Sequence, residues 1–198
     1  MIRQLIKLCF AIVLLTASLA QASTWNADLA HSNVGFKVRH MMVSNVRGSF
    51  DKFDATVSYD EKDVTRSSVS VTIEAASINT GVEQRDTHLK SPDFFDAAKF
   101  PQLTFISKRI EKSGEGLKIV GDLTMHGVTK EVTLDVTELN PPVTDPWGSV
   151  RMGASASTRL NRTDYGLLWN KAIEAGGVVV GEMVDIMIEV ELVKLIKK

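Results

Sequence analysis

Residues 78–105 read INTGVEQRDTHLKSPDFFDAAKFPQLTF, and this stretch interrupts the strand-like alternation of the rest of the chain. Thr80 and Glu83 have the spacing of a capping box, which predicts a short helix that begins close to them. Ser91, followed by Pro92, predicts a second helix, because serine caps helix N-termini and proline fits the first helical position. Two short helices need an apolar surface to pack on, so we expect them to cover one end of a sheet.

Alternating apolar and polar residues predict about eight strands in the remainder of the chain. In the last run, Val184, Ile186 and Ile188 share one face. The pattern slips near Phe53, which predicts a β-bulge. The eight runs cover residues 32–39, 46–59, 69–75, 103–105, 117–123, 132–136, 150–160 and 184–192.

The turns that join these runs are short, which is typical of an antiparallel barrel. We therefore predict an all-β fold, an eight-stranded antiparallel lipocalin-like barrel with a short helical insert capping one end. Two packed sheets, a β-sandwich, are the alternative architecture. Eight strands enclose an interior that side chains can fill or that can hold one small ligand.

The N-terminus has the features of a secretory signal peptide. Arg3 and Lys7 precede an apolar run over residues 8–15, and Ala20-Gln21-Ala22 forms an A-x-A cleavage signal. Cleavage after Ala22 would export the mature protein, and the periplasm of a Gram-negative cell is the expected compartment. A retained membrane anchor is the alternative, although the apolar run is shorter than the roughly 20 residues that a membrane span needs.

We therefore expect a signal peptide over residues 1–22 and one barrel domain over residues 23–198. Cys9 is the only cysteine, so the mature chain would contain no thiol and no disulfide. Without Arg3 and Lys7, 21 basic side chains oppose 24 acidic ones. This weakly acidic balance, with no basic block, argues against a nucleic-acid partner.

The alternating runs and the insert carry five sequence motifs. They are His31-Ser32-x-Val34-x-Phe36 with His40, Gly48-x-Phe50-x-x-Phe53, Arg85-Asp86-x-His88-Leu89-x-Ser91-x-Asp93-Phe94, Lys99-Phe100-Pro101-x-x-Thr104-Phe105 and Gly121-Asp122-Leu123-Thr124-x-x-Gly127-Val128-Thr129-Lys130. With these motifs the mature chain resembles the YceI-like family of lipocalin-like, polyisoprenoid-binding periplasmic proteins along nearly its full length. The resemblance implies a barrel with a long apolar cavity that holds an isoprenoid or a similar long-chain amphiphile.

Aromatic, methionine and small side chains are the candidates for the wall of such a cavity. Thioethers adapt to an irregular apolar chain, and alanines that face a barrel interior leave volume unfilled. For any single phenylalanine, packing in a core is the competing interpretation. Arg39, Arg85 and His88 are the candidates for contact with a polar headgroup. The expected lining residues are Val34, Phe36, Val38, Met41, Met42, Phe50, Phe53, Val71, Ile73, Phe94, Phe95, Phe100, Phe105, Leu123, Met125, Met152, Ala154, Ala156, Trp169 and Ile188.

The four histidines do not have the spacing of a metal site. His31 and His40 are nine residues apart, His88 and His126 fall on different predicted elements, and neither H-x-H nor H-E-x-x-H occurs. Zinc needs three or four convergent ligands, so we expect no metal.

Arg85, Asp86 and His88 could instead perform acid–base chemistry, since histidine titrates near neutral pH and Asp86 could orient it. In the structural interpretation, Asp86 caps backbone amides or pairs with Lys90, and Arg85 ties the helix to the barrel.

We therefore predict a binding protein and not an enzyme: a periplasmic carrier or store for a long-chain isoprenoid lipid such as a polyprenyl quinone. No cofactor is expected apart from this bound lipid or quinone. Transient contact with a membrane and a homodimer remain open, as does the alternative of a periplasmic enzyme of unassigned reaction. Mass spectrometry of an organic extract of the protein would separate the two functions.

Overall fold

The computed structural model describes residues 22–174 and 176–196, so nearly all of the predicted signal peptide lies outside the described residues. The described residues form one α-helix, α1 (Glu83–Lys90), and four short 3-10 turns, η1 (Leu29–His31), η2 (Val64–Arg66), η3 (Ala75–Ser77) and η4 (Arg162–Tyr165). Their strands are β1 (Ser23–Ala27), β2 (Asn33–His40), β3 (Ser44–Phe50), β4 (Phe53–Tyr59), β5 (Ser68–Glu74), β6 (Ile78–Asn79), β7 (Gln102–Ser113), β8 (Gly116–Met125), β9 (Val128–Leu139), β10 (Val143–Thr144), β11 (Val150–Asn161) and β12 (Val180–Lys194).

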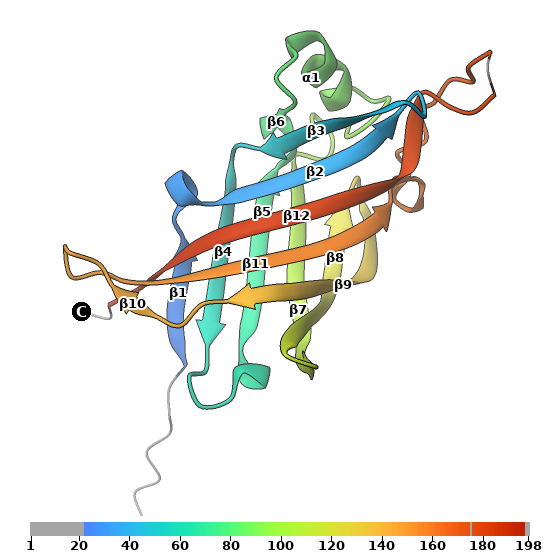
Figure 1. The fold of residues 1–198 in the computed structure, drawn as a ribbon. Helices are drawn as coiled ribbons and strands as arrows, with labels where there is room; N and C mark the ends of the chain where they lie inside the picture. Colours follow the sequence, from blue (N-terminus) through green and yellow to red (C-terminus); the bar gives the residue numbers. More distant parts are fainter. Residues whose placement is uncertain (1–21, 175, 197–198) are drawn as a thin grey trace, which may run out of the picture.

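Eight of these strands close into an antiparallel barrel in the order β1-β4-β5-β7-β8-β9-β11-β12 (Figure 1). The most extensive pairing joins β11 and β12, from Arg151 opposite Val193 to Asn161 opposite Met183. The ring closes because the end of β12 also pairs with β1, with Leu192 opposite Ala27. The predicted eight-stranded barrel is therefore confirmed.

The strand β12 has two partners along the same edge. Its first part pairs with β2, from Val180 opposite His40 to Glu189 opposite Asn33, and only its last residues pair with β1. The strands β3 and β6 continue the sheet outward from β2. The run predicted as the first strand therefore lies beside the closed ring. Its place in the ring is taken by β1, which the sequence pattern did not predict.

The chain turns a corner between β3 and β4. Phe50 ends a strand that pairs with β2, whereas Phe53 begins a strand that pairs with β5 and β1. The amide of Asp51 donates to the carbonyl of Ser77, which fixes the corner outside both ladders. The bulge predicted near Phe53 was therefore wrong, and the slip in alternation marks a change of strand partner.

The insert between β6 and β7 contains one helix and not two. The helix α1 begins after Val82, and Thr80 makes no cap; its backbone amide and hydroxyl donate instead to Asp86. After α1 the chain forms hydrogen-bonded turns, in which Ser91 accepts from the amide of Phe94. The predicted capping box and the predicted second helix were both wrong. The insert nevertheless lies at one end of the barrel, as Figure 1 shows.

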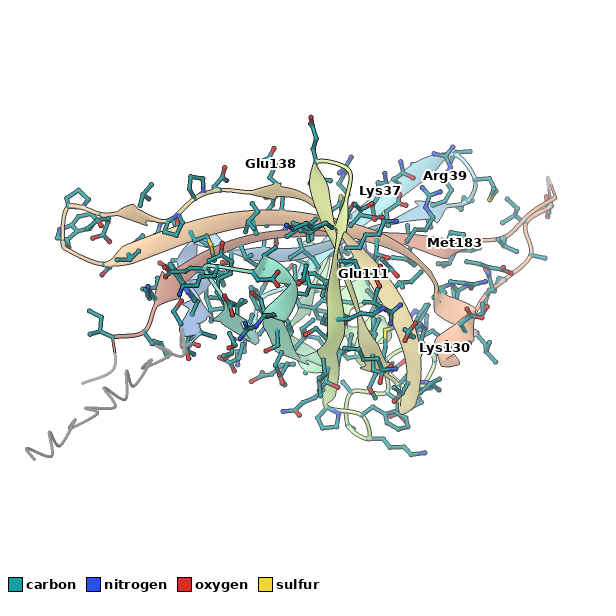
Figure 2. All side chains as sticks on the ribbon, turned by 90° about the horizontal axis from the view of Figure 1, so that it is seen from below. Lys37, Arg39, Glu111, Lys130, Glu138 and Met183 are labelled. Carbon is teal, nitrogen blue, oxygen red and sulfur yellow. The ribbon has the colours of Figure 1, made fainter. Side chains whose placement is uncertain are left out.

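The buried side chains form two clusters. The larger one lies inside the barrel and contains Phe50, Phe53, Ile73 and Leu103 among others. The smaller one joins Trp25, Met152 and Leu192 near the end of β12. Charged side chains such as Lys37, Glu111 and Lys130 lie on the outside (Figure 2). Within residues 22–174 and 176–196, no helix has the length and apolar character to cross a membrane.

Candidate functional site

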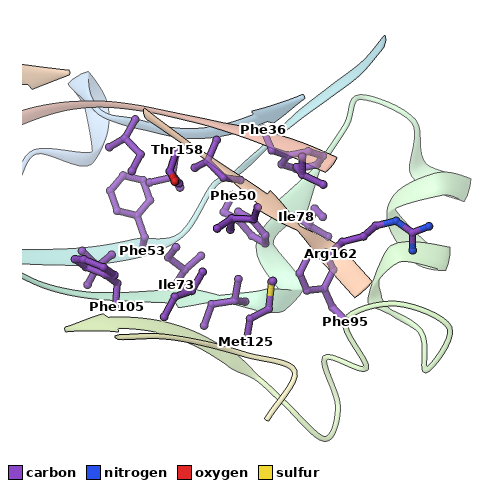
Figure 3. Close-up of a pocket in the computed structure, with 18 of the residues that line it drawn as sticks. Phe36, Phe50, Phe53, Ile73, Ile78, Phe95, Phe105, Met125, Thr158 and Arg162 are labelled. Carbon is purple, nitrogen blue, oxygen red and sulfur yellow. The ribbon is translucent and has the colours of Figure 1, made fainter. Parts of the chain in front are cut away.

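An apolar cavity of about 190 Å³ runs through the barrel interior (Figure 3). Among the described residues, Thr158 and Arg162 are the only polar ones in its wall. An engineered apolar cavity of about 150 Å³ holds one benzene molecule, so the present volume fits a ring-sized fragment. A longer chain would require the side chains of the wall to move apart.

Thirteen of the twenty predicted lining residues come together in this wall. They are Val34, Phe36, Val38, Phe50, Phe53, Val71, Ile73, Phe94, Phe95, Phe105, Leu123, Met125 and Ile188. Alternation along β2, β4, β5 and β12 turns one face of each strand inward, and the turns after α1 add the two adjacent phenylalanines. The predicted insert therefore contributes to the cavity as well as covering it.

Methionines 41 and 42 do not reach the cavity. Both have positive φ angles, 47° and 60°, in the turn that joins β2 to β3, and both are exposed. Phe100 also lies elsewhere, because its ring packs against His126 with 4.6 Å between centroids. Trp169 is not part of the wall, and its ring packs on Phe94 with 5.2 Å between the ring centroids.

On β11 the small inward residues are too short to contribute to the wall. Ala154 and Ala156 pair with Val190 and Ile188, which do line the cavity, so the alanines share their face. Met152, one step earlier on this face, is buried in the smaller cluster with Trp25. The expectation that these three residues line the cavity is therefore not met.

Fourteen lining residues were missed: Ala55, Ile78, Leu89, Leu103, Val132, Leu134, Thr158, Leu160, Arg162, Leu167, Val180, Val184, Ile186 and Val190. The alternation of the predicted strands carried the signal for most of them, since Val184, Ile186 and Val190 share the face of Ile188. On β11 the inward series runs through Thr158 and Leu160, and the next inward position is Arg162. Continuing the period by one step would have found this arginine.

Arg162 is 5% exposed and ends the cavity below α1. Its Nε donates to the carbonyl of Gly181 at 2.9 Å, its Nη2 to that of Val180 at 3.3 Å, and its Nη1 to that of Leu167. Burial lowers the pKa of Arg162, and the negative charge of Glu182 partly opposes this shift. These bonds fasten the segment between η4 and β12 across the end of the barrel.

An aromatic cluster of His88, Phe94 and Trp169 joins the insert to that same segment. The ring of His88 packs edge-on with two aromatic rings. The distance between ring centroids is 5.1 Å to Phe94 and 4.9 Å to Trp169. Its Nε2 lies 2.8 Å from Asp93. Because Phe94 lines the cavity, this cluster forms part of the cover over its end.

The proposed acid–base residues do not converge. Arg85 donates through Nε to the hydroxyl of Thr80 at 2.7 Å and through Nη2 to its carbonyl at 3.0 Å. Asp86 accepts from the amide of Thr80 at 2.9 Å. His88 faces Asp93, so Asp86 does not orient it. Asp86 accepts from a backbone amide, as the structural interpretation predicts, and among the described residues it does not pair with Lys90. Arg85 binds Thr80 at the start of the insert and not a residue of the barrel, so the predicted tie between helix and barrel is not seen.

The predicted headgroup candidates lie outside the cavity wall. Arg39 donates through Nη2 to the carbonyl of Met42 at 2.7 Å and so braces the exposed β2–β3 turn. Arg85 and His88 are engaged as described above. Arg162 is the residue of the wall that carries a charge, and no headgroup role was predicted for it.

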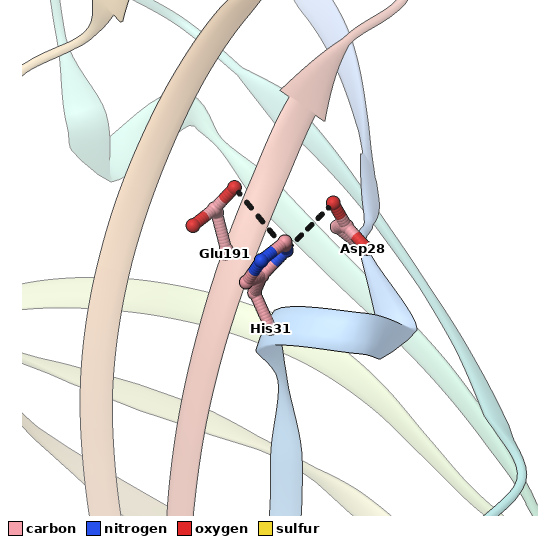
Figure 4. A group of neighbouring side chains, drawn as sticks. All are labelled: Asp28, His31 and Glu191. Atoms are coloured by element: carbon pink, nitrogen blue, oxygen red, sulfur yellow. Dashed lines mark hydrogen bonds and ion pairs between the residues drawn. The ribbon is translucent and has the colours of Figure 1, made fainter.

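A group of potential metal ligands lies near the other end of β12. Asp28, His31 and Glu191 place one ligand atom each within 4.8 Å of one another (Figure 4). The Nη1 of Arg151 lies 2.8 Å from the carboxylate of Asp28 and also contacts Glu191. The hydrogen bond from Arg151 is the main reason why the pKa of Asp28 falls to about 2. An ion-pair network therefore accounts for this group without a metal.

Comparison with known proteins agrees with this architecture. The YceI-like domain model matches residues 25–192. The UPF0312 protein SAS2572 of Staphylococcus aureus strain MSSA476 is 44% identical over 156 residues, which is 78% of this chain and 88% of that protein.

Solved structures show the same fold. A YceI protein of Campylobacter jejuni aligns with a TM-score of 0.68 and 34% identity, covering 85% of this chain and 96% of that one. BcnA of Burkholderia cenocepacia aligns with a TM-score of 0.73 and 25% identity, covering 83% and 98%. A polyisoprenoid binding domain from Saccharophagus degradans, implicated in plant cell wall breakdown, shares the fold with a TM-score of 0.61 at 15% identity, covering 88% and 100%.

Proposed function

The chain belongs to the YceI-like family, and from that premise we propose that it is a binding protein that carries or stores a long-chain isoprenoid lipid in its barrel. One observation carries the proposal: an interior cavity whose wall, as far as residues 22–174 and 176–196 form it, is apolar except for Thr158 and Arg162. A solved structure with the same fold, described as a polyisoprenoid binding domain, supports the same ligand class. A polyprenyl quinone is one lipid of this class.

Burial of apolar surface would supply most of the binding free energy. Transfer of apolar surface out of water contributes about 25 cal/mol per Å², which the entropy lost in ordering a flexible chain partly offsets. The wall is rich in phenylalanine, and Met125 adds a flexible thioether. Rotation of these side chains would widen the cavity for a chain longer than its present volume admits.

The enzyme alternative has less support. An acid–base pair needs its members within hydrogen-bond reach, and His88 pairs with Asp93 on the surface of the insert, away from Asp86. In the cavity wall the described residues offer no histidine, carboxylate or thiol. A lipid carrier requires none of these groups.

Export is part of this proposal. Cleavage after Ala22 would place the barrel in the periplasm, where a lipid must be shielded from water to cross between membranes. We expect the exported protein to begin at Ser23, the first residue of β1. The intact mass of the exported form tests this step, and a mass that includes residues 1–22 would contradict it.

Mass spectrometry of an organic extract tests the binding proposal. The protein is exported in its full-length form, purified without detergent and extracted, beside a periplasmic protein of similar size without an apolar cavity. We expect a prenyl lipid in near-stoichiometric amount from the barrel and only traces from the control. Equal traces from both proteins, repeated after incubation with isoprenoid-containing membranes, would contradict a carrier function.

A further inference from the structure

Arg162 places a buried positive charge at one end of an otherwise apolar cavity. Figure 3 shows its side chain leaving the wall toward α1, whereas Phe53 and Phe105 lie at the opposite end. Its aliphatic part lines the cavity, and 5% of the residue is exposed. A ligand in this cavity would therefore lie against hydrocarbon along its length, and its end nearest α1 would approach the guanidinium just beyond the wall.

In the part of the chain that the structure describes, no carboxylate forms an ion pair with this guanidinium. Its three hydrogen bonds within the described residues go to backbone carbonyls, which are dipoles without net charge. A guanidinium has five N–H groups, so two find no acceptor among the described residues. Glu182 acts on it through space but makes no ion pair with it in the described part of the chain. The half-buried Arg151 differs, because it contacts three carboxylates.

Burial of an unpaired charge is costly, and pairing it with a buried anion recovers part of the cost. We propose that the Arg162 end of the cavity binds the headgroup of the lipid, and that this headgroup presents a negatively charged oxygen, as in a prenyl phosphate or a carboxylate. The tail then runs toward Phe53 and Phe105. This inference rests on the proposed function and narrows it, because it favours anionic amphiphiles over neutral alcohols and quinones.

Arg162 also has a structural role, which the test must separate from headgroup binding. Its bonds to Leu167, Val180 and Gly181 hold the covering segment, so its loss would weaken binding of every ligand alike. A headgroup contact predicts something different, a change in the ratio between ligands that share a tail and differ in the headgroup. Comparison of such ligands therefore isolates the contact.

The probes are farnesyl phosphate, farnesoic acid and farnesol, titrated into the delipidated full-length mature protein. We expect at least one of the two anions to bind roughly tenfold to a hundredfold more tightly than farnesol, the range for a hydrogen bond to a charged group. The Arg162→Gln variant should bring this ratio close to one, and Arg162→Lys should retain part of it. Arg159→Gln, which removes an exposed arginine paired with Asp185, is the matched control and should leave the ratio unchanged.

The outcomes distinguish the headgroup assignment from the proposed lipid-binding function. Equal binding of the anions and farnesol to the unaltered protein, or a preference that survives in Arg162→Gln, would overturn the headgroup assignment and leave the lipid-binding function intact. Binding of none of the three ligands would overturn the proposed function itself.

A second measurement needs no change at Arg162. Trp169 packs on Phe94 at the Arg162 end, whereas Trp25 packs in the smaller cluster that Val190 of the cavity wall also contacts. The measurement uses a Trp147→Phe background, which removes an exposed tryptophan. The probes are α-bromododecanoic acid, which carries the bromine quencher beside the carboxylate, and ω-bromododecanoic acid, which carries it at the end of the tail. The contribution of Trp169 is the part of the fluorescence that the Trp169→Phe substitution removes. We expect the α-bromo acid to quench this contribution more strongly than the ω-bromo acid does. Stronger quenching of that fluorescence by the ω-bromo acid would overturn the proposed orientation.

Discussion

Arg151 connects three carboxylates where β12 changes its partner from β2 to β1. It binds Asp145 at 2.7 Å and Asp28 at 2.8 Å, and it contacts Glu191. Asp28 also accepts from the amide of Ala30 and so caps η1, the turn that carries the chain from β1 to β2. The network therefore holds the junction between the closed ring and the β2–β3 flank.

This network predicts a specific loss of stability in acid. The pKa of Asp28 is lowered to about 2 in the folded protein, from 3.8 when unperturbed, and that of Asp145 is lowered by Arg151. A carboxyl group whose pKa is lower in the folded than in the unfolded chain stabilises the fold at pH values above the unfolded pKa. This contribution is lost as the pH falls from about 4 toward 2. In thermal melts over this range, Asp28→Asn should lose less stability than the unaltered protein. Asp54→Asn, at an exposed site on β4, is the control, and equal slopes for all three proteins would contradict the account.

Tyr165 carries a buried hydroxyl with no hydrogen-bond partner in the described residues. Its side chain is 2% exposed, and burial raises the pKa of Tyr165 to about 12. Removal of an unsatisfied polar atom spares its desolvation cost, about 1–3 kcal/mol. We expect Tyr165→Phe to leave the free energy of unfolding unchanged or to raise it, as measured by urea denaturation. A loss of more than about 1 kcal/mol would mean that the hydroxyl has a partner in solution.

At the scale of the elements, the pairing of β7 and β8 depends on a close approach at Gly121. A Cβ at this position would lie 2.5 Å from the carbonyl of Ile106 and 2.6 Å from the ring of Phe105, so the strands would have to shift. We expect Gly121→Ala to lower the free energy of unfolding by roughly 1–3 kcal/mol. Gly153→Ala on β11 is the matched control, because its nearest contact is the side chain of Asn140 at 3.3 Å. Equal urea midpoints for the two variants would show that β7 and β8 do not pair so closely.

The elements that the sequence predicted are those with long alternation. The strands β11 and β12 carry 12 and 15 residues, and their apolar period is visible without any tertiary information. The strand β1 has five residues, too few for a period, and tertiary pairing with β4 and β12 forms it. Local helix signals were less reliable. The hydroxyl of Thr80 binds Asp86 where a capping box would direct it to a helix amide, and turns replace the helix predicted after Ser91.

At the scale of the whole molecule, the alternation of apolar residues identified which side of each strand faces the barrel interior. It did not show which of these residues reach the cavity. The sequence placed Phe36, Ile73 and Ile188 inward, and all three line the cavity. Period alone could not show that Ala154 and Ala156 stop short of the wall, because that depends on the sizes of the side chains opposite them. The position of Arg162 was predictable from the period, but its burial depends on carbonyls 18 and 19 residues further along the chain.

The central claim is that an apolar ligand occupies the barrel interior, and one comparison of thermal melts tests it most directly. Thr158→Phe adds a ring inside the cavity, whose volume of about 190 Å³ can receive it, whereas Ser157→Phe adds the same ring on the outer face of β11. With farnesol at a hundredfold excess over its Kd, the Tm of the delipidated unaltered protein and of Ser157→Phe should rise by about 5–10 °C. The Tm of Thr158→Phe should be close to normal without ligand and should change little with it. A rise in Thr158→Phe as large as in the unaltered protein would contradict binding inside the barrel.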